Sequence, residues 1–466
     1  MSFLLLPLLV VIVHFRPHDP MTVESVDWAS FWPCLVDPPE GTLAEVYGAR
    51  GSEQDRDVFV YQKPFNFIPP QPSPPLSVKE YLLGLAGVRE RCEIFDPRKL
   101  GLGGLIKHRW DQKQKTGQFR TTVTGARIRS SQGTKSPWMV ELYLNPGRSH
   151  KPVSVPAKAV GNISQPYDPR AFSFLGAPAR DVMFWYRTPR ARDLQVNEHA
   201  SEEGSKGGDG AEESWSTAMS CEPVDRATRG HARDLHAVLI NPYPIGDLSG
   251  VLVPFPFEER PQGLARSLDA ITVGLTFASE LLAGARRDDD RSTNLRVGFN
   301  SIGAGASIGH LHFQFWRVVG GLDGRVPIER APTWPPSPTS FDDVELAVIP
   351  TNYHPIRSLV LSGRSIPALA KAAAHCVNVL MDRNIPFSLL MNGQHLYIMP
   401  RRFANTTFPF ASAGFPEAAG FLLVVNDTYW RDPSLLNADI VWDLWRESFD
   451  VGEEMFNGIL SACANA

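Results

Sequence analysis

One stretch of the sequence, residues 296–318, constrains the fold and the chemistry of this chain more than any other. It reads RVGFNSIGAGASIGHLHFQFWRV, with a loop of small residues at 301–309. His310, His312 and Gln314 then follow at every second position. Alternate side chains of a strand share one face, so the three polar groups should point one way and their apolar neighbours into the core. Polar groups on a buried strand cost free energy unless a partner satisfies them, so the pattern favours a ligand site.

The residue types in this stretch suit chemistry on a phosphate group. An imidazole can act as a nucleophile, and a flanking histidine or backbone carbonyl can fix its tautomer. Gln314 can donate a hydrogen bond to an oxygen without adding charge. Gly303, Gly305 and Gly309 would let the backbone approach a ligand, and successive N–H groups there would form an anion-binding nest. Together these parts predict attack of a histidine on a phosphorus atom.

Two other interpretations of the histidine pair remain open at this point. Histidines two positions apart on a strand can bind a metal, but no Cys, Asp or Glu that could serve as a third ligand lies nearby in the sequence. The pair could also be structural, because buried polar groups usually find partners within the protein. The combination of the glycine loop with the H-x-H-x-Q strand is more specific than either feature alone.

The composition excludes several classes of function. The chain has 466 residues, which suggests two lobes or one large double domain. Its net charge of −4 gives no indication of a nucleic acid or an anionic membrane as partner. The five cysteines are scattered and form no C-x-x-C pair, which argues against a disulfide framework or a cysteine-based zinc site and fits a reducing compartment.

The first part of the chain gives an ambiguous signal. Residues 1–75 are predicted to be an irregular N-terminal segment, and the apolar run at 3–13 is too short to span a bilayer. That run resembles the core of a signal peptide but lacks a preceding Lys or Arg, and Met21 offers a second start. A cytoplasmic protein is therefore expected, with targeting, a secreted protein or a membrane anchor as the alternatives. No membrane association is expected for the rest of the chain.

Two halves of similar order are predicted for the remainder, with an α+β fold. The first half, 76–320, contains strand, turn and strand at 236–255, a helix from Leu264 to near Gly284, and strands at 295–300 and 310–318. It also contains a low-complexity acidic insertion at 197–214, which is predicted to be disordered. The second half, 321–466, repeats the order as a strand at 358, a helix at 365–384 and strands at 387–392 and 395–402. It lacks the H-x-H-x-Q pattern, so we expect a duplicated unit with antiparallel sheets flanked by helices, in which one half has lost its chemistry.

The sequence resembles the histidine-triad superfamily, in the branch of galactose-1-phosphate uridylyltransferase where glutamine replaces the last histidine. The closer resemblance is to the GDP-hexose phosphorylases, which act on GDP-L-galactose or GDP-D-glucose. The segments that carry it are RWDQKQKTGQFRTTVT (109–124), LNPGRSHKP (144–152), QPYDPRAFSF (165–174), LRVGFNSIGAGASIGHLHFQ (295–314), VPIERAPT (326–333) and YHPIRSLVL (353–361). They occur in the family's order over roughly residues 76–400.

The resemblance implies a mechanism and a set of site residues. His312 would attack the α-phosphorus of a GDP-hexose and expel hexose 1-phosphate, and inorganic phosphate would then release GDP from the guanylyl-histidine. Gln314 would replace an acid, and His310 would line the phosphate site. Non-bridging oxygens would be held by Asn300 and by the loop of Gly303, Gly305 and Ser307. Asn145 and Arg148 would contact the nucleotide. The scheme requires no metal and no cofactor.

Several alternatives stay open beside this interpretation. A dinucleoside polyphosphate phosphorylase and a hexose-1-phosphate nucleotidyltransferase would share the nucleophile and differ in the second substrate. A non-catalytic nucleotide-binding regulator is a more remote alternative. Which hexose is used is not encoded in a local motif, and a monomer and a homodimer are both compatible with a duplicated unit.

The sequence departs from the family's pattern at a few positions. Ser173 and Leu175 stand where the family usually has Asn and then Lys, and only Lys151 remains of a basic run. These segments are expected to lie outside the chemical centre, so the departures bear on substrate choice more than on the reaction type. Asp168 could contact the nucleotide or form a turn before its proline.

Arg357 and His395 are further polar residues of the second half. Arg357 could bind phosphate, although a lone arginine at a strand start is more often a solvated end. His395 stands on an expected strand and is interpreted as structural.

Overall fold

A computed structural model describes residues 60–62 and 66–68 and, with short gaps, 97–188 and 235–465. All of these residues belong to one compact unit. The expectations for the apolar run at 3–13 and the acidic insertion at 197–214 lie outside the described residues, as do those for Lys151 and Leu175.

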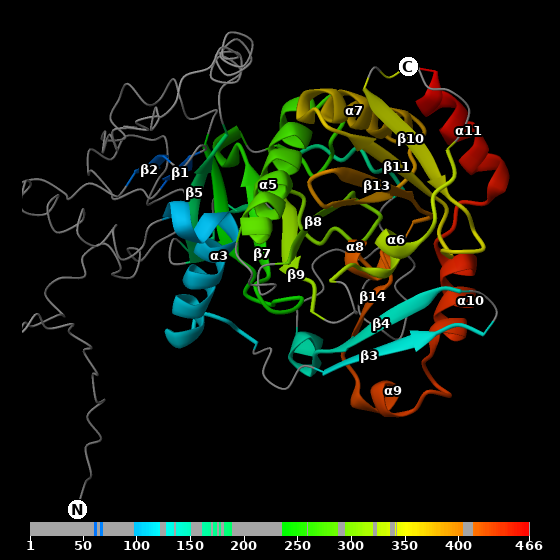
Figure 1. Ribbon diagram of the computed structural model, residues 1–466, viewed down its shortest axis with the longest axis horizontal. Helices are drawn as coiled ribbons and strands as arrows, with labels where there is room; N and C mark the ends of the chain where they lie inside the picture. The colour runs from blue at the N-terminus through cyan, green and yellow to red at the C-terminus, as the bar shows by residue number, and fades with distance from the viewer. Residues whose placement is uncertain are drawn as a thin grey trace, which may run out of the picture. The chain divides into compact units, whose positions relative to one another are not determined.

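The core of the fold is an 11-stranded sheet in the order β10-β11-β13-β12-β8-β9-β7-β6-β5-β1-β2, antiparallel except for the β1–β5 pair (Figure 1). Its strands are β1 (Val60–Gln62), β2 (Asn66–Ile68), β5 (Val182–Arg187), β6 (Leu235–Ile240), β7 (Gly250–Pro254), β8 (Leu295–Asn300), β9 (Phe313–Arg317), β10 (Val344–Ile349), β11 (Ser358–Gly363), β12 (Phe387–Met391) and β13 (His395–Pro400). A second sheet has the order β14-β4-β3 and consists of β3 (Arg127–Gln132), β4 (Met139–Leu144) and β14 (Phe421–Val424).

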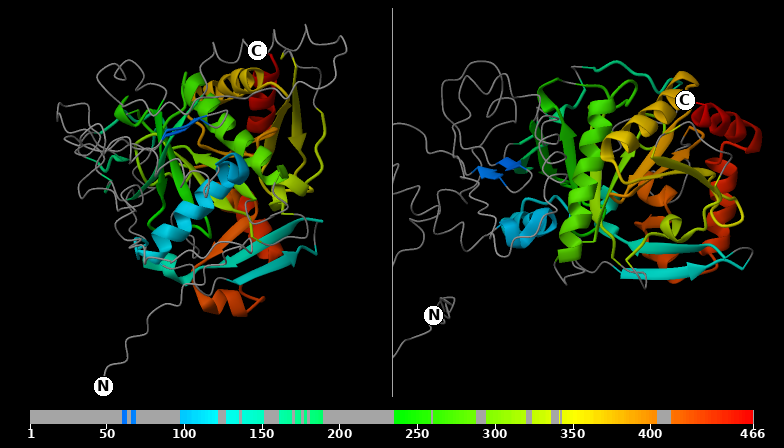
Figure 2. Two further views of the ribbon diagram at one scale, coloured as in Figure 1. Left: turned by 60° about the vertical axis from the view of Figure 1, so that its left-hand side comes forward. Right: turned by 45° about the horizontal axis from the view of Figure 1, so that its top comes forward.

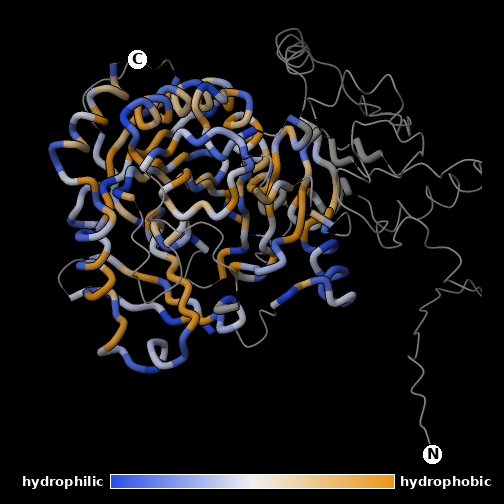
Figure 3. Tube along the Cα trace, turned by 180° about the vertical axis from the view of Figure 1, so that it is seen from behind, coloured by the Kyte–Doolittle hydropathy of each residue, from blue (hydrophilic) through white to orange (hydrophobic). Residues whose placement is uncertain are grey.

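Helices cover both faces of the large sheet (Figure 1, Figure 2). One face packs against α3 (Pro97–Lys115), α5 (Leu268–Arg287), α7 (Ile366–Asp382) and α11 (Glu453–Ala464), which share one hydrophobic cluster with it. The other face packs against the small sheet and against α6 (Pro327–Arg330), α8 (Phe415–Ala418), α9 (Asp427–Arg431) and α10 (Ala438–Ser448), in a second cluster. Figure 3 shows hydrophobic residues concentrated in the strands between these layers.

The strand order confirms the expected duplication. In the first half the hairpin β6–β7 is followed by α5 and the hairpin β8–β9, and in the second half β10–β11 is followed by α7 and β12–β13. Each half arranges its strands in the same order outward from the centre, where β8 pairs with β12 in antiparallel register. The fold is therefore α+β and pseudo-symmetric, with the two halves joined into one continuous sheet.

The helices begin and end for local reasons. The side chain of Ser365 caps α7 by accepting a hydrogen bond from the amide of Ala368, and a proline follows in the first turn. The chain leaves α7 through Asn384, whose φ of +54° is typical of a residue that ends a helix.

The helix α5 differs from its predicted bounds. It begins at Leu268, four residues after the apolar pattern, and continues past Gly284. Leu264 packs from the preceding loop, and Leu268 is exposed in the first helical turn.

Candidate functional site

The histidine stretch lies at the centre of the sheet, between β8 and β9, but its strand is shorter than predicted. β9 begins at Phe313, not at His310. His310 makes an isolated bridge with Pro261, and the amide of His312 donates to the side chain of Gln262 (2.8 Å) in place of a strand neighbour. Side chains still alternate as expected: Leu311 and Phe313 are fully buried in the helix-side cluster, while Gln314 is half-buried on the other face.

His312 is held in one tautomer by the backbone. Its Nδ1 lies 2.8 Å from the carbonyl oxygen of His310, and because a carbonyl can only accept, Nδ1 carries the proton. In the neutral ring the lone pair therefore resides on Nε2, which the side-chain NH₂ group of Gln314 approaches within 3.5 Å. This is the arrangement that a nucleophilic imidazole requires. The ring of Phe174 packs against it, with centroids 5.1 Å apart.

His310 has the opposite tautomer. Its Nδ1 accepts the backbone N–H of Phe174 (3.2 Å) and lies 3.0 Å from the hydroxyl of Ser173. Burial, assisted by His312, lowers the pKa of His310 to about 4, so the ring is neutral near pH 7. The proton is then on Nε2, which is buried without a hydrogen-bond partner among the described residues. Such an orphan donor suits a ligand oxygen.

The contact with Ser173 corrects one expectation. The segment that contains Ser173 was expected to lie outside the chemical centre, yet Ser173 and Phe174 contact His310 directly. Sequence separation hides this contact, because Ser173 and His310 are 137 positions apart. The departure from the family's pattern at Ser173 therefore bears on the environment of a histidine as well as on substrate choice.

Gln262 is a site residue that the sequence patterns did not indicate. Its side-chain oxygen accepts the amide of His312, and its NH₂ group donates to the carbonyls of Asn300 (2.9 Å) and His312 (3.2 Å). The side chain is 2% exposed. One amide thus joins the end of β8 to the histidine stretch. No local signal marks Gln262, because it stands in a loop before α5 and belongs to no periodic pattern.

Asn300 ends β8 beside the histidines. It is 5% exposed, and its Oδ1 accepts a hydrogen bond from the hydroxyl of Ser388 on β12 (2.9 Å). The second half therefore contributes directly to the environment of a predicted site residue.

The glycine loop is anchored to the second half of the chain. Ser301 donates its amide to the carbonyl of Phe387 (3.0 Å), and its hydroxyl accepts the amide of Phe387 (2.9 Å). Gly303 and Gly305 have φ values of +81° and +96°. Their missing side chains are explained by the backbone and by packing, because a Cβ would lie 2.7 Å from the ring of Phe403 and 2.8 Å from the carbonyl of Ala413.

The sequence suggested that Gly303 and Gly305 let a ligand approach the backbone. Their φ values and their packing explain both glycines without a ligand. At Gly309 a Cβ would meet no atom within 4 Å, so space remains there. The amides of Gly305 and Ala306 have no acceptor within the described part of the chain, which leaves them available to an anion. Ser307 is half-buried beside them.

Asn145 and Arg148 support a turn. The NH₂ group of Asn145 donates to the carbonyls of Pro244 (3.1 Å) and Ile245 (3.2 Å), and Arg148 donates to the carbonyl of Tyr243 (2.7 Å). Both residues thus hold the β6–β7 connection. Their contact with a nucleotide remains a prediction, which is supported by the buried Oδ1 of Asn145, since this atom lacks a partner among the described residues.

The remaining polar candidates have structural contacts. The carbonyl of Asp168 accepts the amide of Ala171 in a turn. Arg357 is not a solvated end: it forms an ion pair with the buried carboxylate of Asp450 and joins β11 to the segment between α10 and α11. Nδ1 of His395 lies 2.8 Å from the hydroxyl oxygen of Ser362.

Metal-ligating clusters and long apolar helices are both missing from the part of the chain that the structure describes. Its residues contain no group of three or more His, Cys, Asp or Glu side chains that could hold a metal ion. None of the helices described is long and apolar enough to cross a membrane.

Three known proteins illustrate what this chain is similar to. The chain is 25% identical to GDP-L-galactose phosphorylase 1 of Arabidopsis thaliana over 67% of its own length and 60% of that protein. It is 22% identical to GDP-D-glucose phosphorylase 1 of Danio rerio over 61% of its length and 64% of that protein. The chain thus matches less than two thirds of the length of these relatives. Yeast Ap4A phosphorylase Apa2 with bound Ap4A has a TM-score of 0.42 and 15% identity, covering 73% of this chain and 96% of that one.

Family models match both halves. A model described as GDPGP1-like, N-terminal domain covers residues 216–316, and one described as GDPGP1-like, C-terminal domain covers 327–465. The gap between them, 317–326, begins at the last residue of β9 and lies between the two repeats of the fold. Together the two models account for just over half of the sequence, and the chain belongs to the GDPGP1-like family.

Proposed function

We propose that this protein is a GDP-hexose phosphorylase, with GDP-L-galactose or GDP-D-glucose as substrate and inorganic phosphate as acceptor. The observation that carries the proposal is the orientation of His312, whose Nδ1–H donates to the carbonyl of His310, so that the neutral ring has its lone pair on Nε2 beside Gln314. The names of the relatives supply the substrate class.

The reaction follows from this geometry in two displacements. Nε2 of His312 attacks the α-phosphorus, a P–N bond forms, and the P–O bond to hexose 1-phosphate breaks. An oxygen of inorganic phosphate then attacks the guanylyl-histidine, the P–N bond breaks, and GDP leaves. Hexose 1-phosphate departs as an anion that needs little protonation, so a neutral Gln314 suffices where a stronger acid would otherwise be required. The orphan Nε2–H of His310 would donate to a phosphate oxygen.

The first experiment is phosphorolysis of GDP-L-galactose, GDP-D-glucose and GDP-D-mannose, with GDP and hexose 1-phosphate both quantified. Replacing His312→Ala should lower turnover by about 10³-fold or more, because the covalent route is lost. His395→Ala is the matched control, since it removes a histidine at the start of the corresponding strand of the second half and should retain turnover. Absence of GDP from every sugar in the wild type would refute the proposal.

A second measurement identifies the acceptor. The enzyme is incubated with GDP-hexose labelled in the guanosine, without phosphate, and the protein-bound label is isolated. Inorganic phosphate should discharge it as GDP. Discharge by a hexose 1-phosphate alone would indicate a nucleotidyltransferase, and labelling from a dinucleoside polyphosphate in place of the GDP-hexose would indicate the other phosphorylase.

We further propose a cytoplasmic location and a catalytically complete single chain. Cys376 and Cys463 are both free and buried, which fits a reducing compartment. The two halves already form one sheet within a chain, so a second copy is not needed to complete it. Cell fractionation and sedimentation of the purified protein test the two statements.

A further inference from the structure

The amide of Asn300 is oriented by a residue of the second half. Asn300 and Ser388 are register partners at one end of the β8–β12 ladder, and the hydroxyl of Ser388 lies 2.9 Å from Oδ1 of Asn300. A hydroxyl can donate or accept, so this contact alone does not decide which end of the amide faces Ser388. The decision depends on what else contacts the hydroxyl.

Arg401 provides the second contact of this hydroxyl. Its Nη1 lies 3.1 Å from the hydroxyl oxygen of Ser388, and a guanidinium can only donate. The oxygen of Ser388 accepts from Arg401, which leaves its proton for Oδ1 of Asn300, the acceptor that lies 2.9 Å away. The NH₂ group of Asn300 is then directed away from Ser388, toward Gly414, where a Cβ would lie 3.0 Å from Nδ2.

The surroundings of Arg401 strengthen this chain of hydrogen bonds. Arg401 is 1% exposed, and Nη1 also approaches the carbonyl of Ala304 (3.3 Å) in the glycine loop. The guanidinium lies over the ring of Phe449 at 4.5 Å, and its Nε and Nη2 have no hydrogen-bond partner in the described residues. Burial lowers the pKa of Arg401 to about 10, so the group stays charged near pH 7. A buried cation thus supports both the loop and Ser388.

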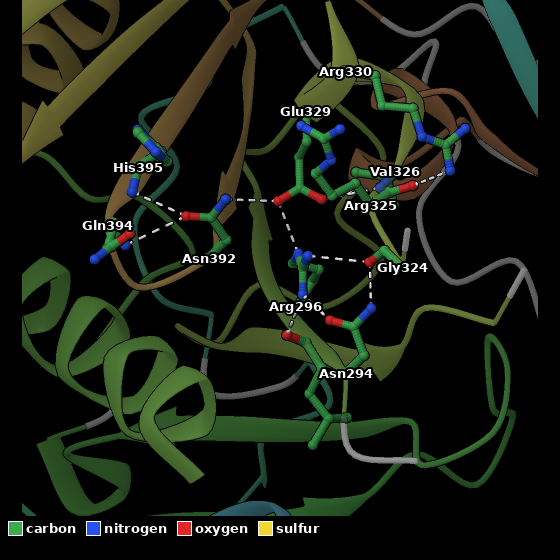
Figure 4. A network of polar contacts seen from close by, with 11 residues as sticks. Asn294, Arg296, Gly324, Arg325, Val326, Glu329, Arg330, Asn392, Gln394 and His395 are labelled. Carbon is green, nitrogen blue, oxygen red and sulfur yellow. Dashed lines mark hydrogen bonds and ion pairs between the residues drawn. The ribbon is translucent and has the colours of Figure 1, made fainter. Parts of the chain in front are cut away.

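The other end of the same ladder shows what such an asparagine does. Beyond the pair Met391–Val297, the next positions are Asn392 and Arg296. Oδ1 of Asn392 accepts the amides of Gln394 (3.3 Å) and His395 (3.0 Å), and Nδ2 donates to the carboxylate of Glu329 (2.7 Å) (Figure 4).

Each asparagine stands at the end of the first strand of the second hairpin of its half: Asn300 ends β8, and Asn392 follows β12. In each, the amide oxygen is held by protein donors. In the second half the NH₂ group binds an internal anion, the carboxylate of Glu329. The side chain of Asn300 lies on the same face of the sheet as Gln314, because Gly298, two residues before Asn300, is the register partner of Gln314. On this face the first half would receive an anion from outside.

We propose that Arg401 and Ser388 are positioning residues that fix the amide of Asn300, so that its NH₂ group donates to a phosphate oxygen of the bound nucleotide. The inference rests on the proposed function for the identity of that nucleotide. It assigns a part in the reaction to the second half, which lacks the H-x-H-x-Q pattern: the second half orients a binding group of the first half.

The test is a double-mutant cycle on the full chain with Ser388→Ala, Asn300→Ala and the double variant. Each is measured for kcat/KM with the GDP-hexose preferred by the wild type and for binding of GDP by calorimetry. Ser388→Ala should lower both by about tenfold, the effect of one lost hydrogen bond. In the Asn300→Ala background the same change should have no further effect, because the relay, meaning the hydrogen bonds from Arg401 to Ser388 and from Ser388 to Asn300, acts through Asn300.

Two comparisons separate positioning from a general structural effect. Ser358→Ala is the matched control, because that serine is equally buried on the neighbouring part of the second half and donates to the carbonyl of Ile356. It should leave turnover and GDP binding unchanged. Arg401→Lys retains a cationic donor, so its kcat/KM and its affinity for GDP should fall less than those of Arg401→Met. The cycle on Ser388 and Asn300 stands even where an Arg401 variant does not fold.

The outcomes distinguish the relay from the proposed function. Turnover with independent, multiplying effects of the two substitutions would overturn the relay while the function stands. Absence of turnover with GDP binding that shows the expected non-additivity would overturn the function and support the relay. A wild type that neither turns over a GDP-hexose nor binds GDP would overturn both.

Discussion

At the scale of single residues, the site depends on how a few amides are satisfied. Gln262 contributes one acceptor and one donor group to three backbone atoms around His312 and Asn300. Under the proposed function, a clamp of this kind would hold His312 within the narrow range of positions that an in-line attack requires. Its loss should therefore affect the reaction more than the fold.

Gln262→Glu tests the donor part of this clamp. The acceptor for the amide of His312 is retained, but a carboxylate oxygen then faces the two carbonyls to which Nε2 donates. We expect Gln262→Glu to lower kcat/KM by about 100-fold. Gln262→Ala should lower kcat/KM less, because alanine removes the contact without introducing repulsion. Steady-state kinetics and thermal melting measure the two effects. Gln394→Glu, at an exposed position, is the control, and wild-type kinetics for Gln262→Glu would show that the clamp is dispensable.

Buried histidines should make the stability of the protein depend on pH. Burial lowers the pKa of His236 to about 3 and that of His354 to about 4, and both are fully buried. Between about pH 6.5, the ordinary pKa of a histidine, and these values the unfolded chain binds protons that the folded chain does not, so the free energy of unfolding falls as the pH falls. For His236 the loss between pH 7 and pH 5 is about 2 kcal/mol.

Urea unfolding at pH 7 and pH 5 measures this dependence. His236→Gln keeps a polar side chain near Thr188 but does not titrate, so the difference between the two pH values should shrink. The matched comparison is His354→Gln, which should reduce the difference similarly. An unchanged difference in both variants would mean that these histidines are not the source.

At the scale of elements, the close packing of β8 against α8 depends on Gly298. A Cβ at this position would lie 2.1 Å from the ring of Phe415, which is fully buried between the large sheet and the small one. Gly298 is also the register partner of Gln314, so a shift of β8 here would reach the site.

Gly298→Ala should destabilise the protein by about 1–3 kcal/mol through overpacking. Urea unfolding measures the loss, and Gly161→Ala is the control, because no atom lies within 4 Å of the Cβ that it would add. Phe415→Leu combined with Gly298→Ala should recover part of the loss. A loss equal to that of Gly161→Ala would show that the strand and helix separate without cost.

Several elements were predictable from sequence because their patterns are local. The strands at 295–300 and 358–363 match their predicted positions, and α7 lies within its predicted range. His310, His312 and Gln314 share one short pattern and are brought together. The predicted start of β9 was wrong, because the side chain of Gln262 replaces the strand neighbour of His312 and no sequence pattern encodes that exchange.

The supporting residues of the site were not predictable for a different reason. Ser173 and Ser388 reach the site from segments far away in the sequence, and a serine among apolar residues carries no signal of its own. The same holds for Arg401, which follows the end of a strand and would ordinarily be interpreted as solvated. The pairing of β8 with β12 brings Ser388 to Asn300, and Arg401 reaches Ser388 from the end of β13.

At the scale of the whole molecule, the duplicated halves meet along β8 and β12 and have diverged at the two ends of that ladder. One end has the long glycine loop and the histidines. The other has the tight turn at Gly393 and a buried ion pair between Arg296 and Glu329 (Figure 4). The carboxylate of Glu329 accepts the hydrogen bond that the NH₂ group of Asn392 donates. In the second half, a side chain of the protein thus takes the place that an external anion would have in the first half.

This ion pair should be a strong tie between the halves. Arg296 lies on β8 and Glu329 on α6, and their side chains are 8% and 1% exposed, at 2.8 Å. Removing one partner leaves a buried charge uncompensated, so Glu329→Leu or Arg296→Met alone should cost about 3–5 kcal/mol in the free energy of unfolding. The double variant should cost less than either single one, because apolar groups of similar volume can replace a buried pair.

Urea unfolding of the four proteins forms the cycle that measures the coupling. Arg260 and Asp269 form an exposed pair, and Asp269→Asn is the control that should change stability by less than about 1 kcal/mol. Losses that simply add in the double variant would show that the two charges do not compensate each other. Kinetics then decide what the tie does for the reaction: if the double variant regains stability and keeps turnover, the halves need only be joined. If it regains stability but loses turnover, the reaction depends on the position that this ion pair gives to β8 and, with it, to Asn300.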